Sequence, residues 1–304
     1  MTRVLAIAGP VLIAAFAAAT WLLTGAALRP VQRMASEAET ISAARIGRRL
    51  PQPAGNDEIA ELGRTLNAML DRIKAAVARE RSFIDNAAHE LRTPIAVLRG
   101  ELELAELETD DPPVVAASLR SALEEADRLT RITEDLLTLA RADAGELVPG
   151  TASTDLLASA RSAVQGLPHR PEVTIEVRGE PTVVRGDPEW LGQMIRNLVV
   201  NGERYARSRV VVTTTSAGGH SRLVVADDGP GFPPELLLRA FDRFARGEGP
   251  RSEASGGAGI GLAIVASLVH ALGGTVTASN GGPLGGACVE ATLPVAPSAD
   301  SSGR

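Results

Sequence analysis

One histidine in this chain has neighbours that are suited to phosphoryl chemistry. His89 opens the string His-Glu-Leu-Arg-Thr-Pro at residues 89–94, so Glu90 is adjacent and Thr93 comes one helical turn later. A carboxylate beside an imidazole favours the tautomer whose attacking nitrogen is unprotonated, which makes His89 a candidate nucleophile. A lone histidine is more often a solvated or capping residue. The candidate therefore needs a source of phosphate elsewhere in the chain.

Two motifs further along are suited to a nucleotide. Asn197 and Asn201 lie four residues apart in a predicted helix, so both amides can face a magnesium ion that bridges phosphates. Asp227 ends a predicted strand, and its carboxylate can accept a hydrogen bond from an adenine amino group. Gly229 and Gly231 follow it and would let the backbone approach the base. Each motif alone also fits an ordinary turn or a solvated polar stripe.

A second glycine-rich turn precedes a predicted helix at 261–272. Its glycines are Gly257, Gly259 and Gly261. The first amides of a helix suit phosphate, because they are unpaired and lie at the positive end of the helix dipole. A dinucleotide fold would need a strand directly before this turn, and a P-loop would need a lysine after it. Neither requirement is met.

The elements that must position these residues fall into two kinds. Around His89, apolar residues alternate four- and three-residue steps, which predicts a helix packed along a seam, with the histidine on its flank. The seam residues are Ile84, Ala88, Leu91, Ile95, Leu98 and Leu102. Pro94 predicts a kink. A turn at 109–113 and a second periodic helix complete a hairpin, and two such hairpins would form a four-helix bundle.

Beyond about residue 144 the pattern mixes strands with helices. Strands are predicted at 173–177, 182–185, 210–215, 223–226, 275–278 and 289–293, and helices at 155–164, 188–205 and 261–272. This order predicts an α/β sandwich in which one sheet is covered by a helical layer.

The N-terminal part predicts a membrane anchor and a relay module. Residues 4–28 form a run without a charged side chain. This run is longer than the roughly 20 residues that a spanning helix needs, and longer than the apolar region of a signal peptide. Arg29 and Arg33 follow this run, whereas only Arg3 precedes it, so the remainder should face the cytoplasm. Residues 29–77 then show two heptad patterns around a Pro/Gly connector, as in a coiled coil.

Composition excludes several other classes. The chain has 304 residues and a net charge of −6, with 31 basic and 37 acidic residues and 3% aromatics. Neither a basic footprint nor stacking aromatics are present, so nucleic acid is not an expected partner. The single cysteine, Cys288, excludes an internal disulfide and a zinc site built from cysteines.

Taken together, these motifs resemble those of sensor histidine kinases. The resemblance rests on the 89–94 string, the asparagine pair, both glycine boxes and the segment Phe-Asp-Arg-Phe-Ala-Arg at 241–246. It implies a multidomain chain with a transmembrane helix (4–28), a helical HAMP linker (29–77), a dimeric phosphotransfer four-helix bundle (78–145), an α/β ATP-binding sandwich of the GHKL (Bergerat) type (146–297) and a disordered tail (298–304). It also implies location in the inner membrane and a homodimer that passes a phosphoryl group from ATP through His89 to a response regulator.

The same resemblance assigns roles to individual residues. Asn201, helped by Asn197, would hold Mg²⁺, and Asp227 would contact adenine. The remaining nucleotide-binding residues would be Arg204, Gly229, Gly231, Arg246, Gly257, Gly259 and Gly261. Residues 247–256, polar and rich in glycine, look like a mobile lid. Thr93 would direct water in the dephosphorylation of the regulator.

Two departures and one alternative remain. Gly202 stands where the family usually carries alanine, which should loosen the helix by up to ~1 kcal/mol. Only one span is visible, whereas typical members have two around an outside sensor domain. The alternative is a gyrase-like or chaperone-like ATPase clamp of the same fold without phosphotransfer. Such clamps activate water with a glutamate one turn before the metal-binding asparagine, and here that position is Asn197.

Overall fold

The computed structural model describes residues 12–25, 29, 36, 58–107, 111–167, 170–246 and 258–296. These fall into two compact units, Met1–Asp85 and Asn86–Arg304. Residues 12–25 are helical and exposed. Within the described ranges, no helix combines the length and apolarity needed to cross a membrane. The predicted span at 4–28 lies partly outside these ranges, as does most of the predicted 29–77 linker, and the tail at 298–304 lies wholly outside.

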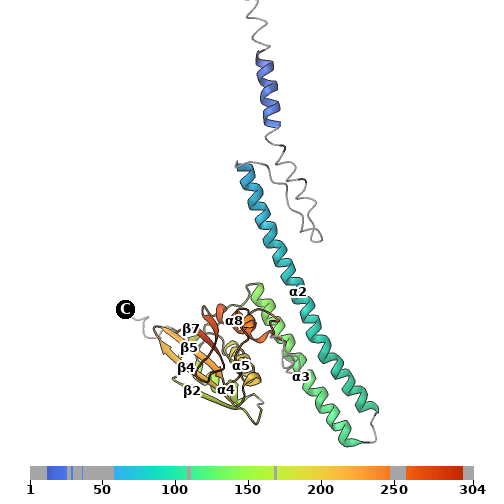
Figure 1. Cartoon of the computed structure of the whole chain (residues 1–304), viewed down its shortest axis with the longest axis vertical. Coiled ribbons are helices and arrows are strands. Elements are labelled where there is room, and N and C mark those ends of the chain that lie inside the picture. The colour runs from blue at the N-terminus through green and yellow to red at the C-terminus, as the bar shows by residue number, and fades with distance from the viewer. Residues whose placement is uncertain are drawn as a thin grey trace, which may run out of the picture. The chain divides into compact units, whose positions relative to one another are not determined.

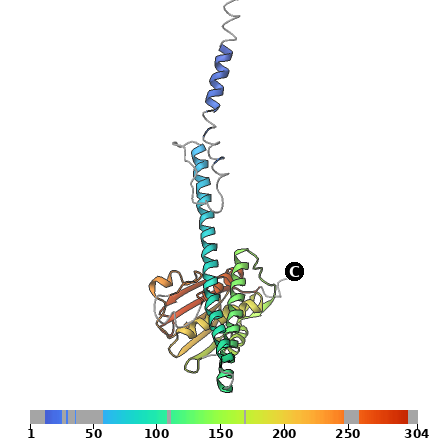
Figure 2. The same cartoon turned by 90° about the vertical axis from the view of Figure 1, so that its right-hand side faces the viewer.

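Two long helices form the hairpin, and the first of them carries the phospho-acceptor candidate His89. Helix α2 (Glu58–Leu107) is continuous through Pro94. Helix α3 (Pro112–Asp143) begins after the N-cap Asp111, whose Oδ1 accepts a hydrogen bond from the Val114 amide (3.4 Å), and prolines occupy its first turn. The C-terminal half of α2 lies beside α3, and the two helices form the predicted hairpin (Figures 1 and 2).

The packed face of the hairpin differs from the predicted seam. Pro94 is buried, whereas Ile95 and Leu102 of the seam are 52% and 47% exposed. On α3, Leu119 and Leu123 are likewise 45% and 67% exposed. The buried residues of α3 are Ser118, Ala122, Ile132 and Leu139. The apolar stripe is therefore wider than the surface at which α2 and α3 of one chain touch. Periodicity alone did not show which of its residues lie at that contact and which stay exposed.

The C-terminal part is built on a five-stranded sheet with the order β2-β4-β5-β7-β6. Its strands are β2 (Thr174–Gly179), β4 (Arg209–Ala217), β5 (His220–Asp227), β6 (Thr275–Asn280) and β7 (Ala287–Pro294). Strands β2 and β4 are parallel, and the other neighbours are antiparallel. A separate pair, β1 (Ser153–Asp155) and β3 (Val183–Arg185), is antiparallel. The strand β1 was not predicted, because its three residues Ser153, Thr154 and Asp155 are polar and form no apolar alternation.

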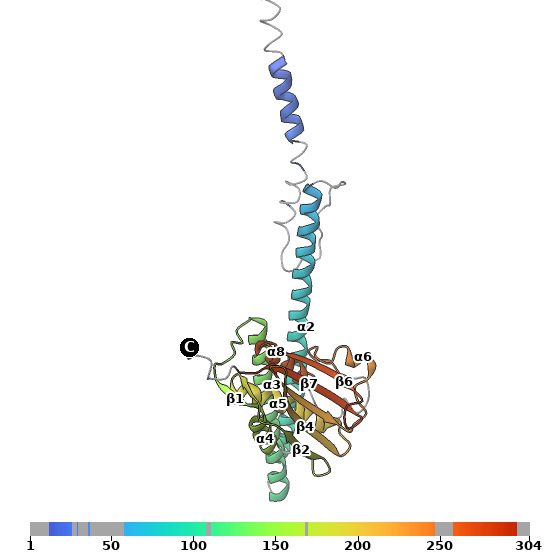
Figure 3. The ribbon, with the colours of Figure 1, turned by 90° about the vertical axis from the view of Figure 1, so that its left-hand side faces the viewer.

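Three helices cover one face of this sheet, as predicted for the sandwich. They are α4 (Leu156–Gln165), α5 (Pro188–Tyr205) and α8 (Gly261–Ala271), and Figures 1 and 3 show them between the sheet and α3. Helix α5 starts at the N-cap Asp187, which accepts a hydrogen bond from the Glu189 amide (2.8 Å). The buried stripe of α5 packs on the sheet and consists of Leu191, Met194, Ile195, Leu198 and Val199. A short helix, α6 (Pro234–Leu237), follows β5 and was not predicted.

Candidate functional site

A large cavity brings the predicted nucleotide-binding residues together. It has a volume of about 1260 Å³ and is lined by parts of α3, α5, the loop after β5 and the N-terminus of α8. The predicted residues that line it are Asn197, Asn201, Arg204, Asp227, Gly231, Arg246, Gly259 and Gly261. Gly229 lies next to this wall and donates its amide to Asp227 (2.8 Å). Gly257 and the predicted lid at 247–256 lie outside the described residues.

Asp227 is fixed at the C-terminal end of β5. Its side chain is buried, and its Oδ1 accepts hydrogen bonds from the amides of Gly229 (2.8 Å) and Ala287 (3.2 Å). Burial raises the pKa of this carboxyl, while the two amides act in the opposite direction. Within the described part of the chain, the second carboxylate oxygen accepts no hydrogen bond. It is therefore available to a donor in the cavity.

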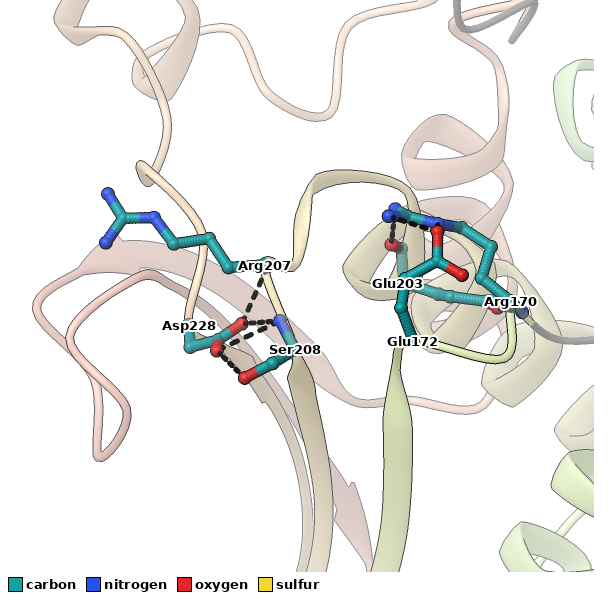
Figure 4. A network of polar contacts seen from close by, with 6 residues as sticks. All are labelled: Arg170, Glu172, Glu203, Arg207, Ser208 and Asp228. Atoms are coloured by element: carbon teal, nitrogen blue, oxygen red, sulfur yellow. Dashed lines mark hydrogen bonds and ion pairs between the residues drawn. The ribbon is translucent and has the colours of Figure 1, made fainter.

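The adjacent Asp228 has a structural use instead (Figure 4). Its carboxylate accepts hydrogen bonds from the amides of Arg207 (2.8 Å), Ser208 (3.0 Å) and Arg209 (3.1 Å) and from the Ser208 hydroxyl (2.7 Å). Burial would raise the pKa of Asp228, but these hydrogen bonds outweigh it and hold the pKa below its ordinary value. Asp228 thus fastens the start of β4 to the end of β5.

A second polar network holds the C-terminal end of α5, also shown in Figure 4. Glu203 is 7% exposed and accepts a hydrogen bond from the Arg170 amide (2.5 Å), while the Arg170 guanidinium donates to the Glu203 carbonyl (3.2 Å). The same guanidinium pairs with Glu172 (3.1 Å). Because Glu203 is committed to these contacts, it orients the turn of α5 that carries Asn201 and Arg204.

The asparagine pair and the start of α8 meet in the cavity. Asn197 Nδ2 is buried and has no hydrogen-bond partner among the described residues. Such a group costs about 1–3 kcal/mol unless a ligand satisfies it. A Cβ added to Gly261 would lie 3.5 Å from Asn197 Oδ1, so the first turn of α8 approaches this amide closely. Among the described residues, no side chain caps the N-terminus of α8, so its first amides are available to an anion.

The 241–246 segment reaches the second glycine box through its backbone. Phe244 adopts a positive φ of 59°, which is unusual for a non-glycine residue, and its amide donates to the Gly259 carbonyl (2.9 Å). Gly259 has a φ of +67°, and a Cβ there would lie 3.1 Å from the backbone of Phe244. Glycine is thus required at 259 by both conformation and close approach.

The phospho-acceptor candidate lies on an accessible surface of α2. His89 and Thr93 are both exposed, one turn apart. The side chain of Glu90 is 14% exposed, and its Oε1 accepts a hydrogen bond from an Arg246 terminal nitrogen (2.6 Å). Glu90 was predicted to assist His89, and Arg246 was predicted to bind nucleotide. In the structure the two are paired with each other, while Arg246 also lines the cavity.

Other contacts between the hairpin and the α/β part were not predicted. Arg243 makes a bidentate ion pair with Asp143 near the end of α3, with both distances 2.5 Å. Gln193 of α5 donates to Asp135 (3.2 Å) and to Thr138 (3.4 Å) of α3. Burial raises the pKa of Asp135 to about 6. Sequence periodicity carries no signal for such pairs, because their partners lie 55 to 100 residues apart.

The described part of this site contains no cluster of charged or histidine ligands for a metal. Among the described residues, no group of three or more His, Cys, Asp or Glu side chains could hold a metal ion. A metal at Asn197 and Asn201 would therefore need further oxygens from a bound phosphate or from water, which suits Mg²⁺. The unpaired amide of Asn197 and the open amides of α8 fit an anionic nucleotide with its metal.

Three family models match the chain in order. HAMP domain matches residues 22–75, His Kinase A (phospho-acceptor) domain matches residues 79–145, and Histidine kinase-, DNA gyrase B-, and HSP90-like ATPase matches residues 186–297. The second range contains His89, and the third contains every residue of the cavity that was predicted to bind nucleotide.

Individual relatives agree with these matches. The chain is 38% identical to the probable sensor histidine kinase TcrY of Mycobacterium tuberculosis, over 92% of this chain and 64% of TcrY. It is 34% identical to the kinase/phosphatase MprB of Mycolicibacterium vanbaalenii, over 97% of this chain and 63% of MprB. Among solved structures, the histidine kinase AdeS of Acinetobacter baumannii matches with a TM-score of 0.55 at 26% identity, over 68% of this chain and 98% of that structure.

The chain spans about three fifths of the length of the curated relatives that it matches. Its three domains nevertheless follow one another in a single order, with the histidine in the second domain and the nucleotide-type cavity in the third. The chain belongs to the sensor histidine kinases of two-component systems.

Proposed function

We propose that the chain is a membrane-anchored, dimeric protein-histidine kinase that phosphorylates itself on His89 and then phosphorylates a response regulator. The observation that carries this proposal is the cavity at α5 and α8, which gathers Asp227, Asn197 and Asn201 within the ATPase domain of a histidine kinase. The exposed His89 lies in the matching phospho-acceptor domain.

In this proposal different residues of the cavity bind the adenine, the triphosphate and the metal ion. Asp227 accepts a hydrogen bond from the adenine amino group through its unpaired carboxylate oxygen. The open amides at the start of α8, together with Arg204 and Arg246, bind the triphosphate. Asn197 and Asn201 offer amide oxygens to Mg²⁺, which neutralises charge on the phosphates when it is bound.

The transfer step needs only a few groups of the protein. An imidazole nitrogen of His89 attacks the γ-phosphorus of ATP, the bond from phosphorus to the bridging oxygen breaks, and ADP leaves. Glu90 takes the proton that the imidazole loses when the new phosphorus–nitrogen bond forms. The phosphoryl group then passes from His89 to an aspartate of the regulator's receiver domain. Thr93, on the same exposed face, positions the water that removes the phosphoryl group from the regulator.

The exposed apolar residues of the hairpin support a homodimer. Ile95, Leu102 and Leu123 each expose 47% or more of their surface, although apolar side chains are normally buried. A second hairpin would cover them and complete a four-helix bundle. We place the domain boundaries at 28, 77, 145 and 297, with a single N-terminal span at 4–28 that holds the catalytic part at the inner face of the cytoplasmic membrane.

Labelling with γ-³²P-ATP and magnesium tests the proposal. The protein should acquire an acid-labile, alkali-stable label, as expected for phosphohistidine. His89→Gln should remove the label while nucleotide binding persists, and Asn201→Asp should abolish labelling without unfolding the chain. Label that survives His89→Gln would mean that another residue is the nucleophile. Release of inorganic phosphate without any label would favour the ATPase clamp instead.

A further inference from the structure

Asn280, at the C-terminal end of β6, contacts the nucleotide wall although it belongs to none of the predicted motifs. Its Oδ1 accepts a hydrogen bond from the Phe232 amide (2.7 Å), and its Nδ2 donates to the Phe232 carbonyl (2.8 Å). The carboxamide thus pairs with both backbone groups of one residue, as a neighbouring strand would. Only an amide side chain offers a donor and an acceptor in this arrangement.

The backbone held in this way is part of the cavity. Residues 230–233 all line it, and they follow directly after Asp227 and Gly229. Gly231 has a φ of +79°, and a Cβ there would lie 2.7 Å from Asn280 Oδ1. The loop backbone therefore lies directly against the carboxamide, which leaves no room for a side chain at 231.

The same β6–β7 hairpin also holds Asp227. The Gly286 amide donates to the Asp227 carbonyl (3.1 Å), and the Ala287 amide donates to its Oδ1 (3.2 Å). One hairpin thus contacts the carboxylate at one point and the 230–233 loop at another. Asn280 is the side chain that connects the hairpin to the loop.

We propose that Asn280 is a positioning residue that determines the preference of the site for adenine over guanine. This inference rests on the proposed function, since it takes ATP as the ligand. Adenine presents an amino donor to Asp227, whereas guanine presents a carbonyl oxygen at the same ring position, which a carboxylate repels. The discrimination depends on a fixed distance between Asp227 and the facing loop. A loop released from Asn280 lets either base shift away from the carboxylate, and the difference between them shrinks.

The test compares nucleotide binding by the full-length chain in detergent micelles. Asn280→Asp keeps the acceptor for the Phe232 amide but places an oxygen against the Phe232 carbonyl. It should weaken ATP binding about tenfold, as expected for one lost hydrogen bond and its unpaired partner, and leave GTP binding within about twofold. Thr277→Ala, which removes an exposed side chain from the same strand, should match the wild type for both nucleotides.

Asn280→Gln is a second variant, which keeps the test possible if Asn280→Asp does not fold. It keeps both polar groups on a longer stem, so it should displace the loop and give an ATP-to-GTP affinity ratio between those of the wild type and Asn280→Asp. A ratio equal to that of the wild type in each folded Asn280 variant would overturn the inference, even if the melting temperature fell, because Asn280 would then support only the hairpin. Failure of the wild-type chain to bind ATP would instead overturn the proposed function.

Discussion

Two adjacent aspartates at the end of β5 show how environment separates residues of the same type. Asp228 receives hydrogen bonds from four donors at its carboxylate, which stabilise the charged form. Asp227 is buried and receives two, so burial dominates and its pKa is raised. The sequence shows both carboxylates side by side, and the fold shows their different surroundings: among the described residues Asp227 lines the cavity, whereas Asp228 does not.

This contrast predicts opposite effects of the same substitution. Asp227→Asn keeps an oxygen acceptor for the Gly229 and Ala287 amides and removes a buried charge. It should therefore leave the melting temperature unchanged or higher while weakening ATP binding about tenfold or more. Asp228→Asn should lower the melting temperature by a few degrees and leave ATP affinity within about twofold. Calorimetric titration with ATP and thermal unfolding of both variants check this, and a stability loss confined to Asp227→Asn would contradict it.

Thr93 allows two activities at one face of α2 to be separated. Its hydroxyl is exposed one turn from His89, where it can hydrogen-bond a water directed at a regulator's phosphoryl group. Transfer from ATP to His89 does not need that water. Thr93→Ala should keep autophosphorylation within about twofold of the wild type but slow regulator dephosphorylation about tenfold or more.

The control for Thr93 is Glu90→Ala, which should mainly slow autophosphorylation. Both variants need a check of folding, since they flank Pro94. Equal dephosphorylation rates for the wild type and Thr93→Ala, in a wild type shown to have this activity, would leave Thr93 as a residue that only pairs with backbone groups near Pro94.

At the scale of elements, the contact between α3 and α5 contains a titrating carboxyl. Burial raises the pKa of Asp135 from 3.8 to about 6, against the lowering effect of its hydrogen bond from Gln193. Between these two pH values the folded chain holds a proton that the unfolded chain has released. The free energy of unfolding therefore falls as pH rises from about 4 to about 6, and the loss is complete above pH 6.

Asp135→Asn should remove this dependence, because asparagine keeps the acceptor for Gln193 without the buried charge. Relative to the wild type, the variant should gain little at pH 4 and about 1–3 kcal/mol above pH 6. Urea unfolding at several pH values measures the difference. Glu124→Gln, which changes an exposed carboxylate elsewhere on α3, should show no such gain. A gain that is already complete at pH 4 would show that titration of Asp135 is not its cause.

Most of the longer elements were predictable from the sequence, while their partners were not. Helix α5 has the predicted bounds of 188–205, because Asp187 and Pro188 provide a start signal and the apolar period is strong. Contacts such as that of Arg246 with Glu90 depend on how separate elements meet, and no local pattern records them. Gly202 is a similar case. It was expected to loosen α5, but a Cβ there would lie 3.3 Å from Val210 Cγ1, so its absence allows close packing on β4.

Most of the candidate site was also visible in the sequence, since asparagines, glycines and Asp227 occur at informative spacings. The residues that hold those motifs in place were missed. Asn280 and Glu203 act through backbone contacts with distant segments, and a polar residue at a strand or helix end looks like any solvated residue in the sequence. The supporting residues of a site thus need the fold to be recognised, whereas the residues that face the ligand often do not.

At the scale of the second unit, Arg243 and Arg246 join the α/β part to the hairpin. Arg243 pairs with Asp143 of α3, and Arg246 pairs with Glu90, the residue next to His89. Within the described residues, the cavity wall includes Arg246 but not His89. Transfer from this cavity to the His89 of the same chain would therefore require a different arrangement. The two ion pairs would oppose that change.

Arg243→Ala should consequently raise the initial rate of autophosphorylation at saturating ATP. Among the described residues, the cavity wall does not include Arg243, so KM for ATP should stay the same. The pair is partly exposed and contributes about 0.5–1 kcal/mol, which corresponds to a two- to fivefold rise in rate. Asp143→Ala should also raise the rate, and the effects of the two substitutions should not add in the double variant, because both remove the Arg243–Asp143 pair. Arg239→Ala, which breaks only a local pair with Asp242, should leave the rate unchanged. Raised salt should accelerate the wild type more than Arg243→Ala, since the ion pair is screened. A slower rate in both single variants would assign the Arg243–Asp143 pair to the arrangement that transfers phosphate.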